Sequence, residues 1–339
     1  MSDTILGPIG DLQLERGGVL KGAKLAYVTE GTLAADKSNV VLLTHGYTSS
    51  HQMMGTANSE GPWSGLVGPG RAIDTNRFFV LSSNMLGSSY GSTAPMTDNP
   101  ATGKPYGPDF PTITLRDIVT AQKQLLASLG INHLVAVVGP SYGGFQAFAW
   151  AGYFPDMMDA IVAAVSGPTS PGDVNREENV RRLALDPNWN GGHYYENGGV
   201  LPAMTAIREA TLRRYGAEAE LAGHMTGKAA IDAEIHRRAD AWARSFDAHS
   251  LLVLGDAAAA FDANPLIAKF KARVLYVLSR TDALFPPSLA PVLMPKLKAA
   301  GVDASYFEID SEHGHMAAGT DAAKWAPTLR AFMDLLSAR

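Results

Sequence analysis

Residues 134–144 read LVAVVGPSYGG, and this stretch decides the fold. An apolar, valine-rich run ends at Gly139, Ser141 follows two residues later, and the glycines at 143 and 144 lead into an apolar stretch with helical character. The order is that of a strand, a sharp turn and a helix. A G-x-S-x-G turn in this setting lifts the serine hydroxyl above the edge of a parallel sheet, where it can attack a carbonyl carbon. Ser141 is therefore a candidate nucleophile, the alternative being a purely structural turn.

Strand-like and helical segments alternate on both sides of this turn. The predicted strands are 40–44, 78–81, 135–138, 160–165, 274–278 and 305–309, and the predicted helices are 114–129, 143–153, 289–300 and 321–336. Residues 12–30 favour an opening antiparallel hairpin. Thr114 with Asp117 resembles a capping box at a helix start. This alternation predicts an α/β protein with a mostly parallel, twisted sheet that carries helices on both faces.

Residues 168–265 differ from the rest of the chain. They begin with PTSPG, contain several charged helical patches and lack strand-like runs. We interpret them as a helical lid inserted into one core, which is formed by residues 1–167 and 266–339. The loop at 86–111 is long and rich in Gly, Pro and Ser, and a loop of this length in a compact domain is usually functional or mobile.

Composition excludes several classes of protein. The chain has 339 residues, 46% of them hydrophobic and 18% charged, with a net charge of −5, which is typical of a globular protein. The sequence contains no block of Lys and Arg residues, so we do not expect a nucleic-acid partner. The absence of cysteine excludes disulfides, thiol nucleophiles and cysteine-based zinc sites. We see no signal peptide and no apolar run long enough to span a membrane, so we expect a cytoplasmic protein without a membrane partner.

A serine hydroxyl becomes a useful nucleophile only beside a base, which in turn needs an orienting carboxylate. Two loops downstream of the serine follow predicted strands, where open α/β sheets place their sites. The first contains Asp282 in SRTDALFPP, and the second contains Asp310, His313 and His315 in DSEHGH. Serine, acid and histidine thus follow in the order typical of α/β-hydrolases. From these residues alone, both histidines remain candidates for the base and both aspartates for the acid.

Two further features complete the candidate site. An oxyanion needs two backbone N–H donors, and we expect them from Tyr142, directly after the serine, and from Tyr47, in the loop after the strand at 40–44. We expect His45 to support this loop. The alternative for the His-Gly pair is a tight turn with a purely structural role. The H-x-H pair at 313–315 could bind a metal, but no third ligand lies nearby in the sequence. We expect neither a metal nor a tightly bound cofactor.

Longer motifs point to a known family. The stretches NMLGSSYGSTAP (84–95), TGKPYGPDFPTITLRDIVTAQKQLLASLGI (102–131) and GPWSGLVGPGRAIDTNRFFVLSSN (61–84) closely resemble homoserine O-acetyltransferases. GPSYGG stands where members of that family have GGSMGG, and SRTDALFPP resembles their acid loop. The likeness is dense over residues 20–165, returns in the acid and histidine loops, and thins out in 170–265.

The resemblance implies an α/β-hydrolase core with a helical lid, often dimerised through the lid helices. It also implies a Ser-Asp-His triad that works through a ping-pong acyl-enzyme. Carried over by position, Ser141 is the nucleophile, Asp282 the acid and His315 the base. The histidine of the family lies in a G-H-D segment, whose first two positions match Gly314-His315, so the resemblance favours His315 over His313 and Asp282 over the alternative acid.

The sequence departs from the family at one informative position. Met316 stands where the homoserine enzymes have an aspartate that is expected to engage the amino group of the substrate, and a thioether cannot pair with an ammonium. The family also holds the substrate carboxylate with a lid arginine in a T-Y-R-S-like stretch. The loose match at 211–214 makes Arg213 a candidate, although a solvated helical face is the simpler interpretation. The chain keeps the acyl-transfer machinery and lacks part of the amino-acid clamp.

Three functions follow as hypotheses. The first is a serine carboxylic-ester hydrolase that acts on a small-molecule ester. The second is an acyl-CoA-dependent O-acyltransferase with an acceptor other than homoserine. The third is a non-catalytic ligand-binding protein, against which the complete set of candidate catalytic residues argues. The first two share their chemistry up to the acyl-enzyme, so the candidate triad does not separate them.

Overall fold

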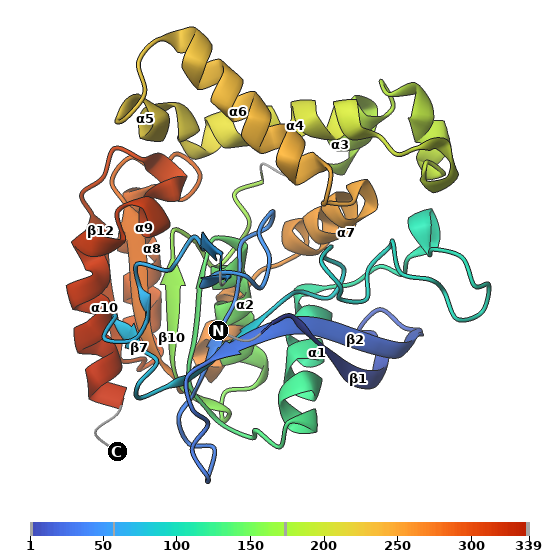
Figure 1. Ribbon diagram of the computed structural model, residues 1–339. Helices are drawn as coiled ribbons and strands as arrows, with labels where there is room; N and C mark the ends of the chain where they lie inside the picture. Colours follow the sequence, from blue (N-terminus) through green and yellow to red (C-terminus); the bar gives the residue numbers. More distant parts are fainter. Residues whose placement is uncertain (1–2, 57, 173–174, 337–339) are drawn as a thin grey trace.

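The computed structural model describes residues 3–56, 58–172 and 175–336, and its centre is an eight-stranded sheet (Figure 1). In sheet order, the strands are β1 (Ile5–Gln13), β2 (Val19–Glu30), β8 (Phe79–Ser83), β3 (Val40–Leu43), β9 (Leu134–Pro140), β10 (Met158–Ala164), β11 (Arg273–Ser279) and β12 (Ala304–Ile309). The six strands from β8 to β12 run parallel, while β1 and β2 form an antiparallel hairpin whose second strand pairs antiparallel with β8. The predicted mostly parallel sheet is confirmed.

Side chains alternate across the sheet and divide the core into two. On β3, Val40 and Leu42 belong to one buried cluster, and Val41 and Leu43 belong to the other. This is the period-two pattern of a strand that is covered on both faces. The first cluster packs against α1 (Leu115–Ser128), α2 (Tyr142–Tyr153) and α8 (Ala290–Ala299), and the second packs against α10 (Ala322–Leu336).

The ends of α1 illustrate how local sequence sets an element boundary. The Thr114 side chain accepts a hydrogen bond from the backbone N–H of Asp117, and the Asp117 carboxylate accepts one from the backbone N–H of Thr114. This reciprocal pair satisfies two donors that a helix start leaves open. The helix ends before Gly130, whose φ of 68° suits glycine. The capping box predicted from sequence is confirmed.

The described part of the stretch predicted as a lid contains five α-helices and lies over the carboxyl end of the sheet (Figure 1). They are α3 (Arg176–Leu183), α4 (Leu201–Tyr215), α5 (Ala217–Ala222), α6 (Lys228–Ala243) and α7 (Ala248–Ala259). A small buried cluster that includes Leu212, Leu221 and Ile235 joins α4, α5 and α6. The division into core and lid stays a prediction, and we call residues 168–265 the insertion.

The remaining elements are short. They include β4 (Gly55–Thr56), β5 (Ser59–Glu60), β6 (Val67–Gly68), β7 (Ile73–Asp74) and α9 (Ala317–Thr320), together with several 3₁₀ helices of three to six residues. The sequence did not predict the four short strands, because two-residue pairings leave no periodicity to detect. Within the described part of the chain, no helix is both long and apolar enough to cross a bilayer.

Candidate active site

Ser141 occupies a tight turn between β9 and α2. Its backbone has φ 55° and ψ −121°, a conformation that costs an L-residue about 1–3 kcal/mol and that persists only where the surroundings hold it. The surroundings do so here, because the Ser141 N–H donates to the Ala164 carbonyl at 2.8 Å and the Ser141 carbonyl accepts from Ser166 Oγ at 2.7 Å. The turn therefore presents the serine side chain at the carboxyl edge of the sheet.

Close packing explains Gly139 and Gly144, the first and last glycines of the segment GPSYGG. A Cβ on Gly139 would lie 2.1 Å from Thr44 Oγ1, and one on Gly144 would lie 2.4 Å from Ser166 Cβ. A Cβ essentially never lies this close to a non-bonded atom, so these positions require glycine. The first glycine lets β9 approach β3, and the second lets α2 approach the end of β10.

Ser141, His315 and Asp282 form one hydrogen-bonded chain. Ser141 Oγ lies 2.8 Å from His315 Nε2, and His315 Nδ1 lies 2.8 Å from Asp282 Oδ2. The other carboxylate oxygen of Asp282 accepts from the backbone N–H groups of Leu284 at 2.8 Å and Phe285 at 3.2 Å. Asp282 is 2% exposed, so its orientation is fixed by buried contacts on both sides.

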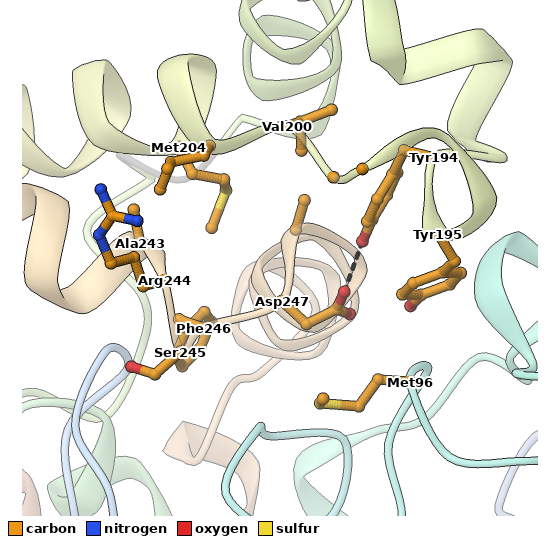
Figure 2. Close-up of a pocket in the computed structure, with 14 residues that line it drawn as sticks. Met96, Tyr194, Tyr195, Val200, Met204, Ala243, Arg244, Ser245, Phe246 and Asp247 are labelled. Carbon is orange, nitrogen blue, oxygen red and sulfur yellow. Dashed lines mark hydrogen bonds between the residues drawn. The ribbon is translucent and has the colours of Figure 1, made fainter.

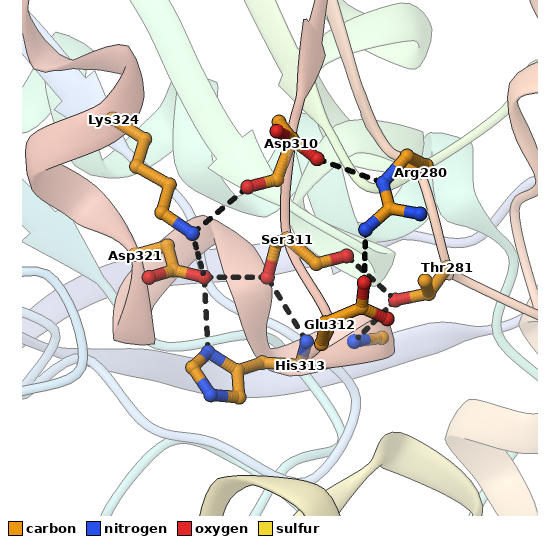
Figure 3. A network of polar contacts seen from close by, with 9 residues as sticks. Arg280, Thr281, Asp310, Ser311, Glu312, His313, Asp321 and Lys324 are labelled. Carbon is orange, nitrogen blue, oxygen red and sulfur yellow. Dashed lines mark hydrogen bonds and ion pairs between the residues drawn. The ribbon is translucent and has the colours of Figure 1, made fainter. Parts of the chain in front are cut away.

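The two alternatives left open by the residues lie elsewhere (Figure 3). His313 turns to Asp321, with His313 Nδ1 2.9 Å from Asp321 Oδ2, and Asp310 pairs with exposed Arg280 at 2.8 Å. Neither contacts Ser141. His313 and His315 do not converge on a common point, and among the described residues no group of three or more His, Asp or Glu side chains is arranged to hold a metal ion.

The same network joins the loops that carry the acid and the histidine. Thr281 Oγ1 donates to the Ser311 carbonyl at 2.9 Å and accepts from the Gly314 N–H at 3.1 Å. Ser311 Oγ in turn donates to Asp321 at 2.5 Å. Because Thr281 precedes Asp282 and Gly314 precedes His315, these bonds fix the two side chains relative to each other.

Tyr47 and Tyr142 flank the serine. Tyr142 directly follows the serine and is the first residue of α2. Gly46 precedes Tyr47, and a Cβ on Gly46 would lie 3.8 Å from Ser141 Cβ, so the loop that carries Tyr47 also reaches the serine. The two rings stack with centroids 5.9 Å apart. The Tyr47 hydroxyl donates to the Leu251 carbonyl of α7, and the Tyr142 hydroxyl donates to that of Leu254 at 3.1 Å. The insertion thus holds both tyrosines in place.

A cavity of about 340 Å³ opens at Ser141 and His315. Its walls are largely apolar and aromatic, and they include Trp63, Met53, Tyr215 and Met316. Among the described residues that line it, none is Asp or Glu. Met316 lines this cavity and also packs against the buried cluster of α4, α5 and α6, so it contributes to the pocket wall and to the seat of the insertion.

Arg213 lies outside this cavity. Its guanidinium pairs with Glu218 and, at 2.9 Å, with Asp232, so it joins α4 to α5 and α6. A role for Arg213 in holding a substrate carboxylate stays a prediction. Arg208 comes closer, because its Nη1 donates to Thr48 Oγ1 at 2.6 Å and Thr48 lines the cavity.

Arg208 is a residue that sequence reasoning missed. Its guanidinium lies 5.0 Å from the ring centroid of Trp242, and its buried Nε has no hydrogen-bond partner among the described residues. Burial lowers its pKa. Among the described residues no acidic side chain forms an ion pair with it. The only signal in the sequence was a cation on the otherwise apolar stretch at the start of α4, and that signal does not say which way the side chain points.

A second cavity, of about 470 Å³, lies between α4, α6, α7 and the loop at Met96 (Figure 2). Tyr194 donates to Asp247 at 2.5 Å in its wall, and Asp247 also caps α7. None of its lining residues lines the cavity at Ser141. Although it is larger, the described residues that line it include no nucleophile–base pair, so we place the candidate site at Ser141.

His45 supports the loop beside the serine, and its burial predicts an acid-sensitive fold. Its ring is fully buried, with Nδ1 2.9 Å from the Gly46 carbonyl and Nε2 2.9 Å from Asn84 Oδ1. Burial lowers its pKa to about 4. As the pH falls, this histidine is therefore protonated in the unfolded chain before it is protonated in the folded protein. Its contribution to the free energy of unfolding is complete above pH 6.5 and is lost as the pH drops towards 4, by roughly 3 kcal/mol in total.

Urea unfolding between pH 7.5 and 5 measures this loss. His51, whose pKa burial also lowers to about 4, contributes in the same direction. His45→Gln removes one titrating group and is expected to flatten the pH dependence of the unfolding free energy. An unchanged slope in that variant would show that His45 does not carry the effect.

Comparison with known proteins agrees with this architecture. The sequence pattern of the alpha/beta hydrolase fold family matches residues 39–322. Homoserine O-succinyltransferase of Comamonas testosteroni is 34% identical, covering 95% of this chain and 92% of its own. Homoserine O-acetyltransferase of Moorella thermoacetica is 36% identical, covering 90% of this chain and 88% of its own.

Solved structures add relatives with a second activity. Esterase E22 is 30% identical with a TM-score of 0.89, covering 98% of this chain and 100% of its own. Homoserine O-acetyltransferase from Bacillus anthracis is 26% identical with the same TM-score of 0.89, covering 98% of both chains. A transferase and an esterase therefore share this fold and resemble this chain equally closely in structure.

Proposed function

This chain belongs to the homoserine O-acetyltransferase-like family of the α/β-hydrolase superfamily, and on that premise we propose that it is a serine carboxylic-ester hydrolase. The protein is an enzyme whose relatives include homoserine acyltransferases and esterases. The observation that favours hydrolysis over acyl transfer to homoserine is the presence of Met316. It lines the cavity beside His315, in a wall without a described acidic residue to pair with an ammonium.

Acylation uses the chain of three side chains. His315 Nε2 takes the proton of Ser141 Oγ as that oxygen bonds to the ester carbonyl carbon. Asp282 accepts from His315 Nδ1–H, which keeps the imidazole in the tautomer that can receive the proton and stabilises the imidazolium that forms. The backbone N–H groups of Tyr47 and Tyr142 stabilise the oxyanion, where one such donor contributes about 3–4 kcal/mol to the transition state.

Collapse of the first tetrahedral intermediate breaks the bond to the alcohol, whose oxygen takes the proton from His315. Water then enters, and His315 removes a proton from it as the water oxygen bonds to the acyl carbon. Collapse of this second tetrahedral intermediate breaks the bond between the acyl carbon and Ser141 Oγ, which takes the proton back from His315 as the acid leaves. No cofactor is needed for either half, because the acyl group passes from alcohol to serine to water without oxidation or reduction.

An acyl-CoA-dependent O-acyltransferase is the second candidate, and Arg208 is the observation that favours it. A buried cation without an acidic partner is costly, and a carboxylate on the acceptor alcohol would pair with it through the cavity at Thr48. In this alternative the acceptor replaces water in the second half-reaction. The acceptor would carry a carboxylate but is not expected to be homoserine, because none of the described residues that line the cavity is an acid that could pair with the ammonium.

Two assays separate these functions. We expect turnover of a short-chain aryl ester that disappears in Ser141→Ala, and no O-acetylhomoserine from acetyl-CoA plus homoserine. Efficient homoserine acetylation would overturn the hydrolase proposal. Absence of any Ser141-dependent acyl chemistry in both assays would support the non-catalytic hypothesis.

Met316→Asp tests the role of this position directly. A carboxylate there can pair with an ammonium, and a hydrogen bond to a charged group contributes about 1.5–3 kcal/mol. We therefore expect homoserine-dependent acyl transfer to rise by roughly 10-fold or more, measured as free CoA released from acetyl-CoA. Met316→Leu, which keeps the volume and apolar character, is the matched control and should show no rise. Equal rates in both variants would mean that Met316 is not the block.

The predicted dimer through the insertion helices and the cytoplasmic location stay predictions. The first is checked by the molar mass of the purified protein in solution, and the second by cell fractionation. Neither bears on the chemistry at Ser141, which needs only residues of one chain.

A further inference from the structure

Two cavities meet at Ser141, and they differ in size. The larger is the cavity of about 340 Å³ already described, and the smaller has a volume of about 30 Å³. Both are lined by Tyr47, Ser141 and Tyr215. His315 lines the larger cavity and is absent from the described residues that line the smaller one. The serine therefore stands between a roomy side that contains the proton donor and a tight side that does not.

Proton delivery decides which half of an ester lies on which side. When the tetrahedral intermediate collapses, the bond between the acyl carbon and the alcohol oxygen breaks, and that oxygen takes the proton from His315 Nε2. The alcohol must therefore lie on the His315 side. We propose that the 30 Å³ cavity binds the acyl chain and the 340 Å³ cavity binds the alcohol, so that the enzyme selects esters of two- and three-carbon acids. This inference rests on the proposed hydrolase function.

The small cavity, which we call the acyl pocket, is walled largely by aromatic rings that pack on one another. Phe145 packs on Tyr142 with ring centroids 5.5 Å apart and on Phe285 with centroids 5.8 Å apart. Leu284 and Ala258 add buried apolar lining, and half-buried Ser170 and exposed Pro171 also line the cavity. The Tyr142 hydroxyl is bonded to the insertion, so this ring cannot swing aside without breaking a buried hydrogen bond.

The volume of the acyl pocket sets the chain length. One water molecule needs about 10–15 Å³ measured in this way, so the pocket has room for about two non-hydrogen atoms beyond the carbonyl carbon. Among the described lining residues none is Lys or Arg. A succinyl group would be too long, and its carboxylate would lie unpaired in an apolar site. The pocket thus favours acetyl and propionyl groups, and not the acyl group of the succinyltransferase relatives.

The first test is the acyl profile of the unchanged protein. The 4-nitrophenyl esters of acetate, propionate, butyrate, hexanoate and monosuccinate share one alcohol and differ only on the acyl side. We expect kcat/KM to be highest for acetate or propionate and to fall about 10-fold or more for each further methylene. Acetates of alcohols of increasing size should show no comparable fall.

Two variants move the limit in opposite directions. Leu284→Ala enlarges the acyl pocket and is expected to raise the butyrate-to-acetate ratio of kcat/KM by about 10-fold. Ala258→Val fills it and should lower the propionate-to-acetate ratio, which keeps the test decisive if the first variant folds poorly. Met316 lines the alcohol cavity and not the acyl pocket, so the acyl ratios of Met316→Ala should equal those of the unchanged protein.

The outcomes separate this inference from the proposed function. If no ester is hydrolysed in a Ser141-dependent manner, the proposed function fails. If esters are hydrolysed but butyrate or longer chains are preferred, or if Met316→Ala shifts the acyl ratios while Leu284→Ala does not, the assignment of the two cavities is wrong and the hydrolase proposal stands.

Discussion

Ser141→Ala is expected to reduce kcat for a short-chain aryl ester by about 10⁴-fold or more, because nothing else in the chain of hydrogen bonds can form the acyl-enzyme. The Ser141 hydroxyl lies 2.8 Å from His315 Nε2, and no cysteine exists to replace it. Steady-state hydrolysis measures the loss, and mass spectrometry of the peptide that contains Ser141 should detect the acyl adduct in the unchanged protein alone.

Ser141→Gly is the matched variant for stability. It also lacks the nucleophile, but glycine adopts φ 55° and ψ −121° without the strain that alanine retains. We expect the free energy of unfolding of Ser141→Gly to exceed that of Ser141→Ala by about 1–3 kcal/mol, and we expect the two variants to have equally low activity. Residual activity within 10-fold of the unchanged protein in either variant would exclude Ser141 as the nucleophile.

Asp282→Asn is expected to reduce kcat by about 10⁴-fold with little change in fold. The contacts of Asp282 give the reason. Oδ1 accepts from two backbone N–H groups, so the asparagine must place its carbonyl oxygen there and turn its NH₂ group to His315 Nδ1. That donor selects the imidazole tautomer with the proton on Nε2, which cannot receive the proton of Ser141.

Asp310→Asn is the control for this second prediction. Asp310 was the competing candidate for the acid, and its exposed side chain pairs with Arg280 on the surface. Its replacement should change kcat by less than about twofold. If the two variants lost activity equally, or if Asp310→Asn lost more, the assignment of the acid would be wrong. Circular dichroism and thermal unfolding of both variants show whether the fold is retained.

Local signals explain why much of the fold could be predicted. The capping box at Thr114, the apolar run before Gly139 and the alternation of strands and helices are written in residues close together in the chain. The parallel sheet follows from that alternation, because parallel strands need crossover helices. The boundaries of most predicted elements moved by one or two residues, but the first strand begins at Ile5, well before residue 12.

The insertion shows where sequence reasoning stopped. Arg213 and Arg208 lie five residues apart on α4, which separates them by about 140° around a helix with 3.6 residues per turn. A helix with cations on more than one face does not reveal which face meets the site. Packing of α4 against α6 decides it, and this packing turns Arg213 to Glu218 and Asp232 while Arg208 reaches Thr48.

The sequence by itself determined the α/β architecture, the strand–turn–helix at Ser141 and the order of serine, acid and histidine, because each depends on neighbouring residues. Only the tertiary structure brought His315, and not His313, to the serine over 174 positions of chain. It alone created the two unequal cavities on either side of Ser141, since each wall combines side chains from distant segments. Cavity size depends on packing in three dimensions, which no local pattern in the chain encodes.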